Sequence, residues 1–394
     1  MRKLDDEHTG RRIAEERKRA GYTQRELAAR LPYSYSLLRQ VEEGHKSASP
    51  DFVSAVARAL HLDVTALTGQ PYVTELQKDR LDTLIRPIRE ALDLYDLGLE
   101  PHAIGKDVTR LISTADELCR LVRATRLNQA AGTLPHAISE LTAACHGRPS
   151  TELWTALAST YRTAHDIAVK LGFYDLATVA LDRMDWASQR ASDPLLAAMR
   201  QYMRALVYFR EGEHTIGLRL IGIGHRLISP SDSSIEALAV AGQLHLGASV
   251  IAARAHDASA VKAHLAEAKA LSTKTGEAGH IHWLSFGPTN VAVHDVSAQV
   301  EMRKYGKAVI KAKDVSLPTA WATSRRAHFF IDRARAEMEI GKTDAALSSL
   351  VTARSLAPQQ TRYHPGARET IKGLVLLQRR TPDTLNHMAA WVGL

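Results

Sequence analysis

Residues 327–360, AHFFIDRARAEMEIGKTDAALSSLVTARSLAPQQ, constrain the fold more than any other stretch of the sequence. Their apolar and small residues recur at spacings of three and four, which predicts two consecutive amphipathic helices. Gly341 is suited to end the first helix, and Pro358 is suited to stop the second. Small residues at Ala334, Ala346 and Ala353 allow a close approach of the two helices. The 34 residues therefore predict one antiparallel helix hairpin.

This unit resembles a tetratricopeptide repeat, in which such hairpins stack side by side. The residues that carry the resemblance are Phe330, Ala334, Gly341, Ala346, Leu350, Ala353 and Pro358. Residues 154–164 echo the first helix of such a repeat, and residues 245–268 fit the pattern loosely. We therefore expect residues 71–394 to form an α-solenoid of tetratricopeptide-like hairpins that serves sensing and dimerisation. A generic helical bundle is the alternative interpretation.

Helical spacing extends over most of the chain, as in Leu196, Met199 and Met203. Aromatic residues make up only 6% of the 394 residues, and long alternating patterns typical of strands are absent. A chain of this length is expected to form more than one domain or one repetitive array. The sequence thus predicts an all-α protein.

Residues 1–70 predict a small helical domain that precedes the solenoid. The expected helices span about 9–20, 23–31 and 35–43, and two more follow the caps Ser49 and Asp63. Thr23 and Glu26 form a capping box, Ser34 caps the third helix, and Pro50 suits the first position of the fourth. The expected core consists of Leu27, Leu31, Leu38, Val41, Phe52, Val56, Leu60 and Leu67.

These elements resemble the Cro/C1-type (XRE) family of helix-turn-helix regulators. The resemblance covers about 61 residues and rests on TQxELA, on SxSxLxxVExG and on SPxFVxAVARAL, in that order. It implies binding to double-stranded DNA, because this motif places its second helix in the major groove. It also implies an internal salt bridge between Arg17 and Glu42.

The predicted recognition helix presents Tyr35, Ser36, Arg39 and Gln40 on its outer face, because Leu38 and Val41 face inward. Arginine pairs well with guanine and glutamine with adenine, whereas Ser36 can bond to either and Tyr35 can reach a phosphate or a thymine methyl. By resemblance, Gln24 contacts the DNA backbone and braces the recognition helix. Backbone amides of residues 23–25 can bind a phosphate. The predicted DNA contacts are Thr23, Gln24, Arg25, Ser34, Tyr35, Ser36, Arg39, Gln40 and Lys46; for each one, an ordinary solvated side chain is the alternative.

Pro32 interrupts the turn before the recognition helix, where a residue with positive φ is usual. Proline fixes φ near −65°, and it disfavours a helical conformation at Leu31. We therefore predict that the second helix ends by Arg30 or Leu31, and that the turn has no left-handed residue at position 32. The recognition helix is then expected to begin at Ser34 or Tyr35.

Residues 283–301, WLSFGPTNVAVHDVSAQVE, form a candidate ligand site in the repeat region. Asn290, His294, Ser297 and Glu301 share one face at helical spacing, and Trp283 precedes them. An inward-facing Asn290 amide can hold a peptide backbone, because it offers both a donor and an acceptor. A solvated polar face is the alternative. His280 and His282 lack a nearby cysteine or carboxylate, so no metal site is predicted.

Enzyme motifs, cysteines, apolar runs and net charge further limit the possible functions of the chain. The chain has none of the common hydrolase, zinc-protease or nucleotide-binding motifs, so we predict neither an enzyme nor a cofactor. Cys119 and Cys145 stand 26 positions apart and predict two buried thiols. The apolar runs look too short for a membrane span, and the N-terminus shows no signal-peptide core, which favours a cytoplasmic protein. The net charge of +8 favours an anionic partner.

Together these features predict a sequence-specific DNA-binding regulator. Proteins that join such a domain to helical repeats resemble bacterial regulators whose repeats bind a signalling peptide or other proteins. We expect a homodimer, because one such domain contacts only half of a DNA site. The alternative is a regulator whose repeats are a protein-interaction scaffold without a small ligand.

Overall fold

A computed structural model describes the chain except residues 1–7, 71–74, 98–106, 230 and 378–381, and it leaves the side chains of residues 75–82 undescribed. Within the described residues there are twenty-one α-helices, one short 3₁₀ helix and no strand. The predicted all-α fold, with an N-terminal helix-turn-helix domain and a C-terminal region of helix pairs, is confirmed. The boundary expected between residues 70 and 71 borders a segment outside the described residues.

The N-terminal domain contains the five predicted helices. They are α1 (Thr9–Arg19), α2 (Gln24–Ala28), α3 (Tyr35–Glu42), α4 (Pro50–Ala59) and α5 (Val64–Thr68). All four predicted caps are present: the Thr23–Glu26 capping box, Ser34, Ser49 and Asp63. Each expected core residue is buried. Local sequence signals therefore determine this domain well.

The turn around Pro32 has the predicted geometry. No residue from 29 to 34 has a positive φ, and α3 begins at Tyr35 after the Ser34 cap. Helix α2 ends at Ala28, within the predicted limit of Arg30 or Leu31 and two to three residues before it. Tighter turns follow it, in which the N–H groups of Arg30 and Leu31 donate to the carbonyls of Leu27 and Ala28. The proline shortens α2 and leaves the motif intact.

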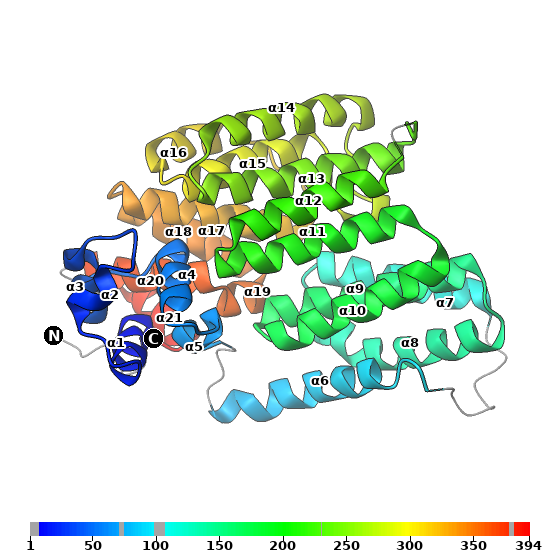
Figure 1. Ribbon diagram of the computed structural model, residues 1–394, viewed down its shortest axis with the longest axis horizontal. Coiled ribbons are helices and arrows are strands. Elements are labelled where there is room, and N and C mark those ends of the chain that lie inside the picture. The colour runs from blue at the N-terminus through cyan, green and yellow to red at the C-terminus, as the bar shows by residue number, and fades with distance from the viewer. Residues whose placement is uncertain (1–7, 71–74, 98–106, 230, 378–381) are drawn as a thin grey trace.

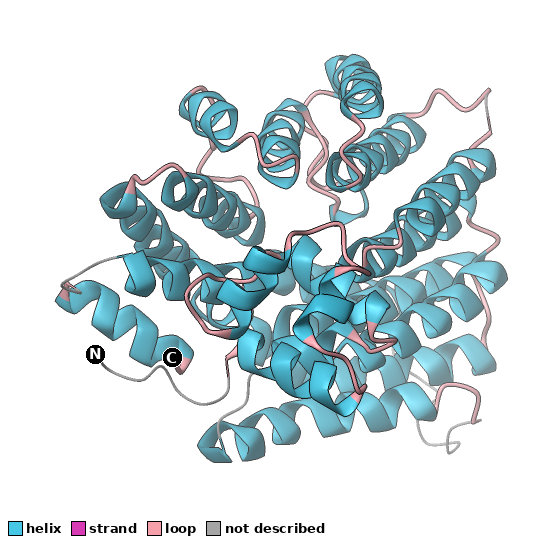
Figure 2. Cartoon of the chain, turned by 60° about the vertical axis from the view of Figure 1, so that its left-hand side comes forward, coloured by secondary structure: helices cyan, strands magenta, loops and turns pink. Residues whose placement is uncertain are grey.

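The repeat region is a succession of helices. They are α6 (Glu75–Asp93), α7 (Val108–Arg123), α8 (Leu127–Gly147), α9 (Thr151–Leu171), α10 (Tyr174–Ala191), α11 (Pro194–Glu211), α12 (His214–Leu227), α13 (Ile235–Arg254), α14 (Ala258–Thr275), η2 (Ile281–Trp283), α15 (Pro288–Glu301), α16 (Tyr305–Lys313), α17 (Thr323–Glu339), α18 (Thr343–Leu356), α19 (Pro358–Tyr363), α20 (Pro365–Leu377) and α21 (Asp383–Val392). From α9 to α18, consecutive helices pack as hairpins. Figure 2 shows these hairpins arranged in an arc around the N-terminal domain.

Residues 327–360 form the predicted hairpin of α17 and α18. Gly341 has φ 78°, a left-handed conformation that glycine adopts without strain. Ala334, Ala346 and Ala353 are fully buried between the helices. Helix α18 ends at Leu356, and Pro358 then opens the short helix α19.

The arc curls until helices from its early and late parts meet, with α9 against α19 and α7 against α17. Lys170 at the end of α9 donates to Gln360 of α19, with 3.0 Å between Nζ and Oε1. The Thr125 hydroxyl, after α7, donates to the Leu356 carbonyl over 3.4 Å. Residues nearly two hundred positions apart thus become neighbours, and the repeat region encloses an interior.

Helix α13 lies at the centre of the repeat region (Figure 1). Contrary to the expectation from apolar runs, it is long and apolar enough to cross a membrane, but 72% of its apolar window is buried inside the protein. Its glycines serve close packing: a Cβ atom at Gly247 would lie 2.7 Å from the Tyr202 ring, and one at Gly242 would overlap the ring of Phe286. The composition of α13 therefore fits a helix packed on several sides. The predicted buried, unpaired state of Cys119 and Cys145 is confirmed.

The N-terminal domain is docked on the repeat region through α4 and α1. The Ser54 hydroxyl donates to the Arg210 carbonyl over 2.7 Å, and Arg58 donates to the Gly212 carbonyl. The Thr9 hydroxyl donates to Glu369 of α20 over 2.9 Å. Consequently the N-terminal domain and the C-terminal helices lie side by side (Figure 1).

Candidate DNA-recognition surface and central cavity

Helix α3 lies at the outer edge of the molecule, whereas α4 and α5 face the repeat region (Figure 1). Tyr35, Ser36, Arg39 and Gln40 are all exposed along α3. The opposite face of α3 is anchored by the buried Leu38 and Val41. The sequence-predicted recognition face is therefore open to solvent.

A buried ion pair fixes α3 against α1. Glu42 accepts hydrogen bonds from Arg17 Nε at 2.7 Å and from Arg17 Nη2 at 2.9 Å. Gln24 adds a third bond through its Nε2 at 2.8 Å, and the remaining Arg17 nitrogen donates to the Tyr22 carbonyl at 2.7 Å. The hydrogen bond to Glu42 raises the pKa of Arg17. The salt bridge implied by the family resemblance is present, and Gln24 braces α3 as expected.

The outer side chains of α3 make only long, exposed contacts. Arg39 lies 3.4 Å from Glu43, and about half of each side chain is exposed. The Gln40 amide donates to the Ser36 hydroxyl over 3.4 Å. Such surface pairs are worth at most about 1 kcal/mol, so they can be exchanged readily for contacts with base edges.

The remaining predicted DNA contacts differ in their availability. Gln24 is half-buried, whereas Arg25 and Lys46 are exposed. Thr23 and Ser34 are exposed, but their hydroxyls accept the capping bonds from Glu26 and Leu37. The Thr23 N–H also donates to Glu26, so it is not available to a phosphate. Of the three predicted amides at this turn, those of Gln24 and Arg25 can bind one.

Comparison with known protein families gives a match over the same helices. Residues 8–68 match a helix-turn-helix domain family. The match runs from just before α1 to the end of α5, so it includes the whole N-terminal domain. No curated protein and no solved structure matches the chain at a significant level.

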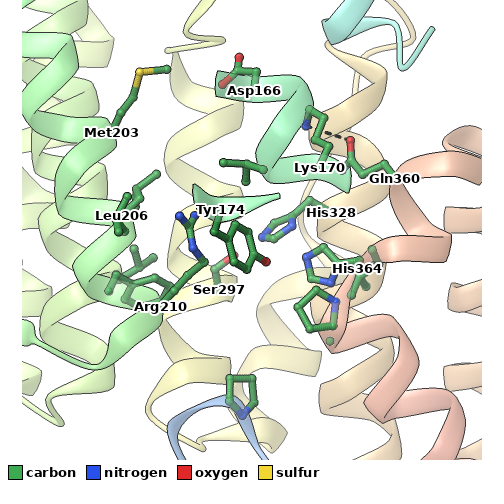
Figure 3. Close-up of a pocket in the computed structure, with 18 of the residues that line it drawn as sticks. Asp166, Lys170, Tyr174, Met203, Leu206, Arg210, Ser297, His328, Gln360 and His364 are labelled. Atoms are coloured by element: carbon green, nitrogen blue, oxygen red, sulfur yellow. Dashed lines mark hydrogen bonds between the residues drawn. The ribbon is translucent and has the colours of Figure 1, made fainter. Parts of the chain in front are cut away.

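The helix-turn-helix domain also forms one wall of a central cavity of about 440 Å³. Pro50 and Val53 of α4, together with Asp63 and Val64 at the start of α5, line that wall. The other walls come from α9, α11, α15, α17 and α19, whose side chains point toward a common space in Figure 3. The cavity therefore lies between the two parts of the protein.

The structure tests the placement of the predicted ligand residues. His294, Ser297 and Glu301 line the cavity, so this face of α15 points inward and the solvated alternative is wrong. Asn290 is fully buried behind the wall, where its amide bonds to Gln243 at 3.2 Å and to Arg325 at 2.9 Å. The predicted role of Asn290 as a peptide clamp is thus corrected, because its amide already has partners.

The prediction for Trp283 also needs correction. The indole lies outside the cavity wall, with Nε1 3.3 Å from an Asp116 carboxylate oxygen. Only the Trp283 carbonyl points inward toward buried cations, accepting from Arg123 Nε at 2.6 Å. The 3₁₀ turn η2, which the sequence did not predict, causes this orientation.

A polar wall that sequence reasoning missed lies where the arc closes. It consists of Lys170, Ser324, Arg325, His328, Gln360 and His364. Burial lowers the pKa of Lys170 to about 8 and that of His328 to about 3. The rings of His328 and His364 lie 5.2 Å apart, and both are neutral at pH 7. Spacing along the sequence gives no signal for this wall, because its members come from distant helices.

An apolar wall lies opposite, on α11. Met199, Met203 and Leu206 line it, and Figure 3 shows Met203 and Leu206 across the space from Lys170 and the two histidines. Arg210 follows on the same helix, with its guanidinium 4.4 Å from the centre of the Tyr174 ring. The cavity thus has two chemically different sides.

Ion pairs neutralise much of the charge around these walls. Asp166 lies 3.1 Å from Arg123, and Glu301 lies 2.8 Å from Arg254. Burial raises the pKa of Glu301, but the charge of Arg254 outweighs burial and holds that pKa below its usual value. Asp166 and Glu301 are therefore committed to cationic partners within the protein.

Proposed function

We propose that the protein is a sequence-specific DNA-binding transcription regulator that works as a dimer and senses a ligand through its helical repeats. The exposed face of α3 within the matched helix-turn-helix domain carries this proposal. Arginine and glutamine at adjacent positions of a recognition helix suit guanine and adenine edges in the major groove. The proposal assigns the chain no catalytic role and places it in the cytoplasm with its DNA.

Dimerisation is proposed from the geometry of such domains. One helix-turn-helix domain reads a single half-site, and two copies read half-sites about 34–36 Å apart. The basic net charge of +8 adds favourable, sequence-independent attraction to phosphates.

Ligand sensing is proposed because the helix-turn-helix domain contributes directly to the cavity wall. A group bound beside the Arg210 side chain contacts the residue whose carbonyl accepts a hydrogen bond from Ser54 of α4. Arg303, at the turn between α15 and α16, holds Asp51 and Tyr33 close to the start of α3. A ligand that favours one arrangement of these contacts would shift the orientation of α3.

An open cavity favours ligand sensing over the scaffold alternative. A pure interaction scaffold needs no interior space, and side chains would fill its concave face. A volume of about 440 Å³ lies within the range of small-molecule sites. A short peptide, as the family resemblance suggests, remains one candidate ligand.

Removing the base-reading side chains is expected to weaken specific DNA binding. Arg39→Ala and Gln40→Ala should each reduce affinity for the selected site about 10- to 100-fold, because a good base contact contributes about 1–3 kcal/mol. Binding sites are selected from random duplexes with the full chain, and affinities are then measured by electrophoretic shift. A footprint of two half-sites is expected.

The control is Arg86→Ala, whose guanidinium on α6 is 81% exposed and far from α3. It should leave affinity for the selected site unchanged. Equal binding by wild type, Arg39→Ala and Gln40→Ala would contradict the proposed base recognition.

A further inference from the structure

Four cations that line the cavity lack an acidic partner. They are Arg162, Lys170, Arg210 and Arg325, and no carboxylate of the described residues lies within ion-pair distance of them. Arg162 donates to the carbonyls of His282 and Trp283. Their contacts are neutral: Lys170 bonds to Gln360, Arg325 bonds to Asn290, and Arg210 covers the Tyr174 ring. Buried charge is costly unless it is compensated, so this part of the wall is suited to an anion from outside the chain.

Polar atoms without partners lie on the same wall. Among the described residues, Ser324 Oγ, Arg325 Nε and His364 Nδ1 are buried and make no hydrogen bond. Ser324 is only 2% exposed, and all three residues line the cavity. Buried polar groups nearly always find partners in folded proteins, so this wall has hydrogen-bonding capacity that the described residues leave unused.

The surroundings of this wall define the rest of the ligand. Met199, Met203 and Leu206 offer an apolar surface across the cavity, as Figure 3 shows for the latter two. Thioether side chains adapt to varied apolar shapes. A molecule that satisfies both walls needs a charged head and an apolar body.

We propose that the cavity binds an organic anion with an apolar body, with its head between Lys170 and Arg325 and its body against α11. The inference rests on the ligand-sensing part of the proposed function and gives the chemical class of the ligand. The anionic head would form charge-assisted hydrogen bonds, which are stronger than neutral ones. The cavity volume fits a molecule of drug-like size.

Such a ligand would connect the two ends of the arc. Lys170 belongs to α9 and Arg325 to α17, and hydrogen bonds to neutral acceptors, such as Lys170–Gln360 and Thr125–Leu356, join the two ends of the arc. An anion between Lys170 and Arg325 would add a charged bridge to these links. Its apolar body would contact α11, whose end holds the helix-turn-helix domain through Ser54.

Calorimetric titration of the full chain tests the proposal with three probes of equal chain length: decanoate, decanol and decyltrimethylammonium. Decanoate is expected to bind at one site, and at least 10-fold more tightly than the other two. Lys170→Gln and Arg325→Gln should each weaken decanoate binding about 10- to 100-fold, as expected for loss of a charged hydrogen bond. Lys262→Gln is the matched control, because Lys262 lines a separate hollow between α14 and α15.

One further variant, together with Arg325→Gln, keeps the test decisive if Lys170→Gln does not fold. Lys170→Arg retains the charge and should bind decanoate within a few-fold of wild type, and Arg325→Gln should still weaken it. Equal affinity for decanoate and decanol, no decanoate binding by wild type, or unchanged binding by Arg325→Gln would overturn the proposal. DNA affinity is measured separately by electrophoretic shift. If the chain binds decanoate but no specific DNA site, only the DNA-binding proposal fails. If it binds a specific DNA site but not decanoate, only the ligand proposal fails.

Discussion

Lowering the pH from 7 to 5 is expected to lower the free energy of unfolding of the repeat region, by about 2 kcal/mol from the buried His165 alone. Other histidines with lowered pKa values add to this loss, among them His245, His328 and His364, whose side chains are partly exposed. Burial lowers the pKa of His165 and His245 to about 4, and that of His328 and His364 to about 3. Their ordinary value is about 6.5, so the unfolded chain takes up protons at pH 5 while the folded chain does not.

The sign follows from proton uptake. Well above pH 6.5 these rings are neutral in both the folded and the unfolded chain. Their lowered pKa values therefore do not change the free energy of unfolding there. As the pH falls toward 4, each histidine favours the unfolded state, by about 2 kcal/mol at pH 5 for the buried His165 and by less for the partly exposed rings. Such a loss is a substantial part of the stability of an ordinary domain, which is 5–15 kcal/mol. Carboxylates titrate mostly below this window, so the histidines dominate the loss.

Urea unfolding followed by tryptophan fluorescence at pH 7, 6 and 5 measures the effect. His165→Asn should lose about 2 kcal/mol less stability than wild type between pH 7 and 5. Its amide can replace the donor that His165 Nδ1 offers to the Ala177 carbonyl. His45→Gln is the control, since the His45 side chain is 71% exposed. A pH dependence that is flat between 7 and 5, or identical in His165→Asn, would refute the explanation.

The second large effect concerns the ion pair beneath α3. Glu42→Gln is expected to destabilise the helix-turn-helix domain by about 3–5 kcal/mol, because it leaves the Arg17 charge buried without its partner. Arg17 is 7% exposed and Glu42 9% exposed, so water cannot replace the lost bonds. Amide hydrogen exchange over residues 8–68 should accelerate, whereas exchange in α9 to α14 should stay slow.

A nearby exposed pair provides the control for Glu42→Gln. Arg11 and Glu15 lie 2.9 Å apart on α1, and nearly half of each side chain is exposed. Glu15→Gln should change stability by less than about 1 kcal/mol. Unchanged exchange rates in α1 and α3 of Glu42→Gln would show that the pair does not hold the domain together.

Local signals explain why the N-terminal domain is predictable. Caps such as Thr23 and Ser34 act within three residues of their partners, and the apolar spacing fixes which face of α3 is buried. The early end of α2 shows the limit of this reasoning, because a proline at position 32 changes the turn geometry before it. Helix ends are set by such small local preferences.

The cavity is predictable only in part. His294, Ser297 and Glu301 share one face of one helix, so their inward direction has a sequence signal. Lys170 and Arg325 lie 155 positions apart in the sequence, and only the closure of the arc brings them to one wall. The prediction for Asn290 was wrong in the opposite direction. Its amide donor and acceptor suggested a ligand role, but they bond to Gln243 and Arg325 within the protein.

The closure of the arc also fixes an order of events during synthesis. The helix-turn-helix domain leaves the ribosome first, but its contacts at Arg303 and Glu369 come from the last quarter of the chain. At about 5–20 residues per second, roughly 15 to 60 s separate the folding of α1 to α5 from the arrival of Glu369. During that interval the nascent domain has a complete recognition helix and no cavity behind it. Control by a ligand therefore begins only after α20 has been synthesised.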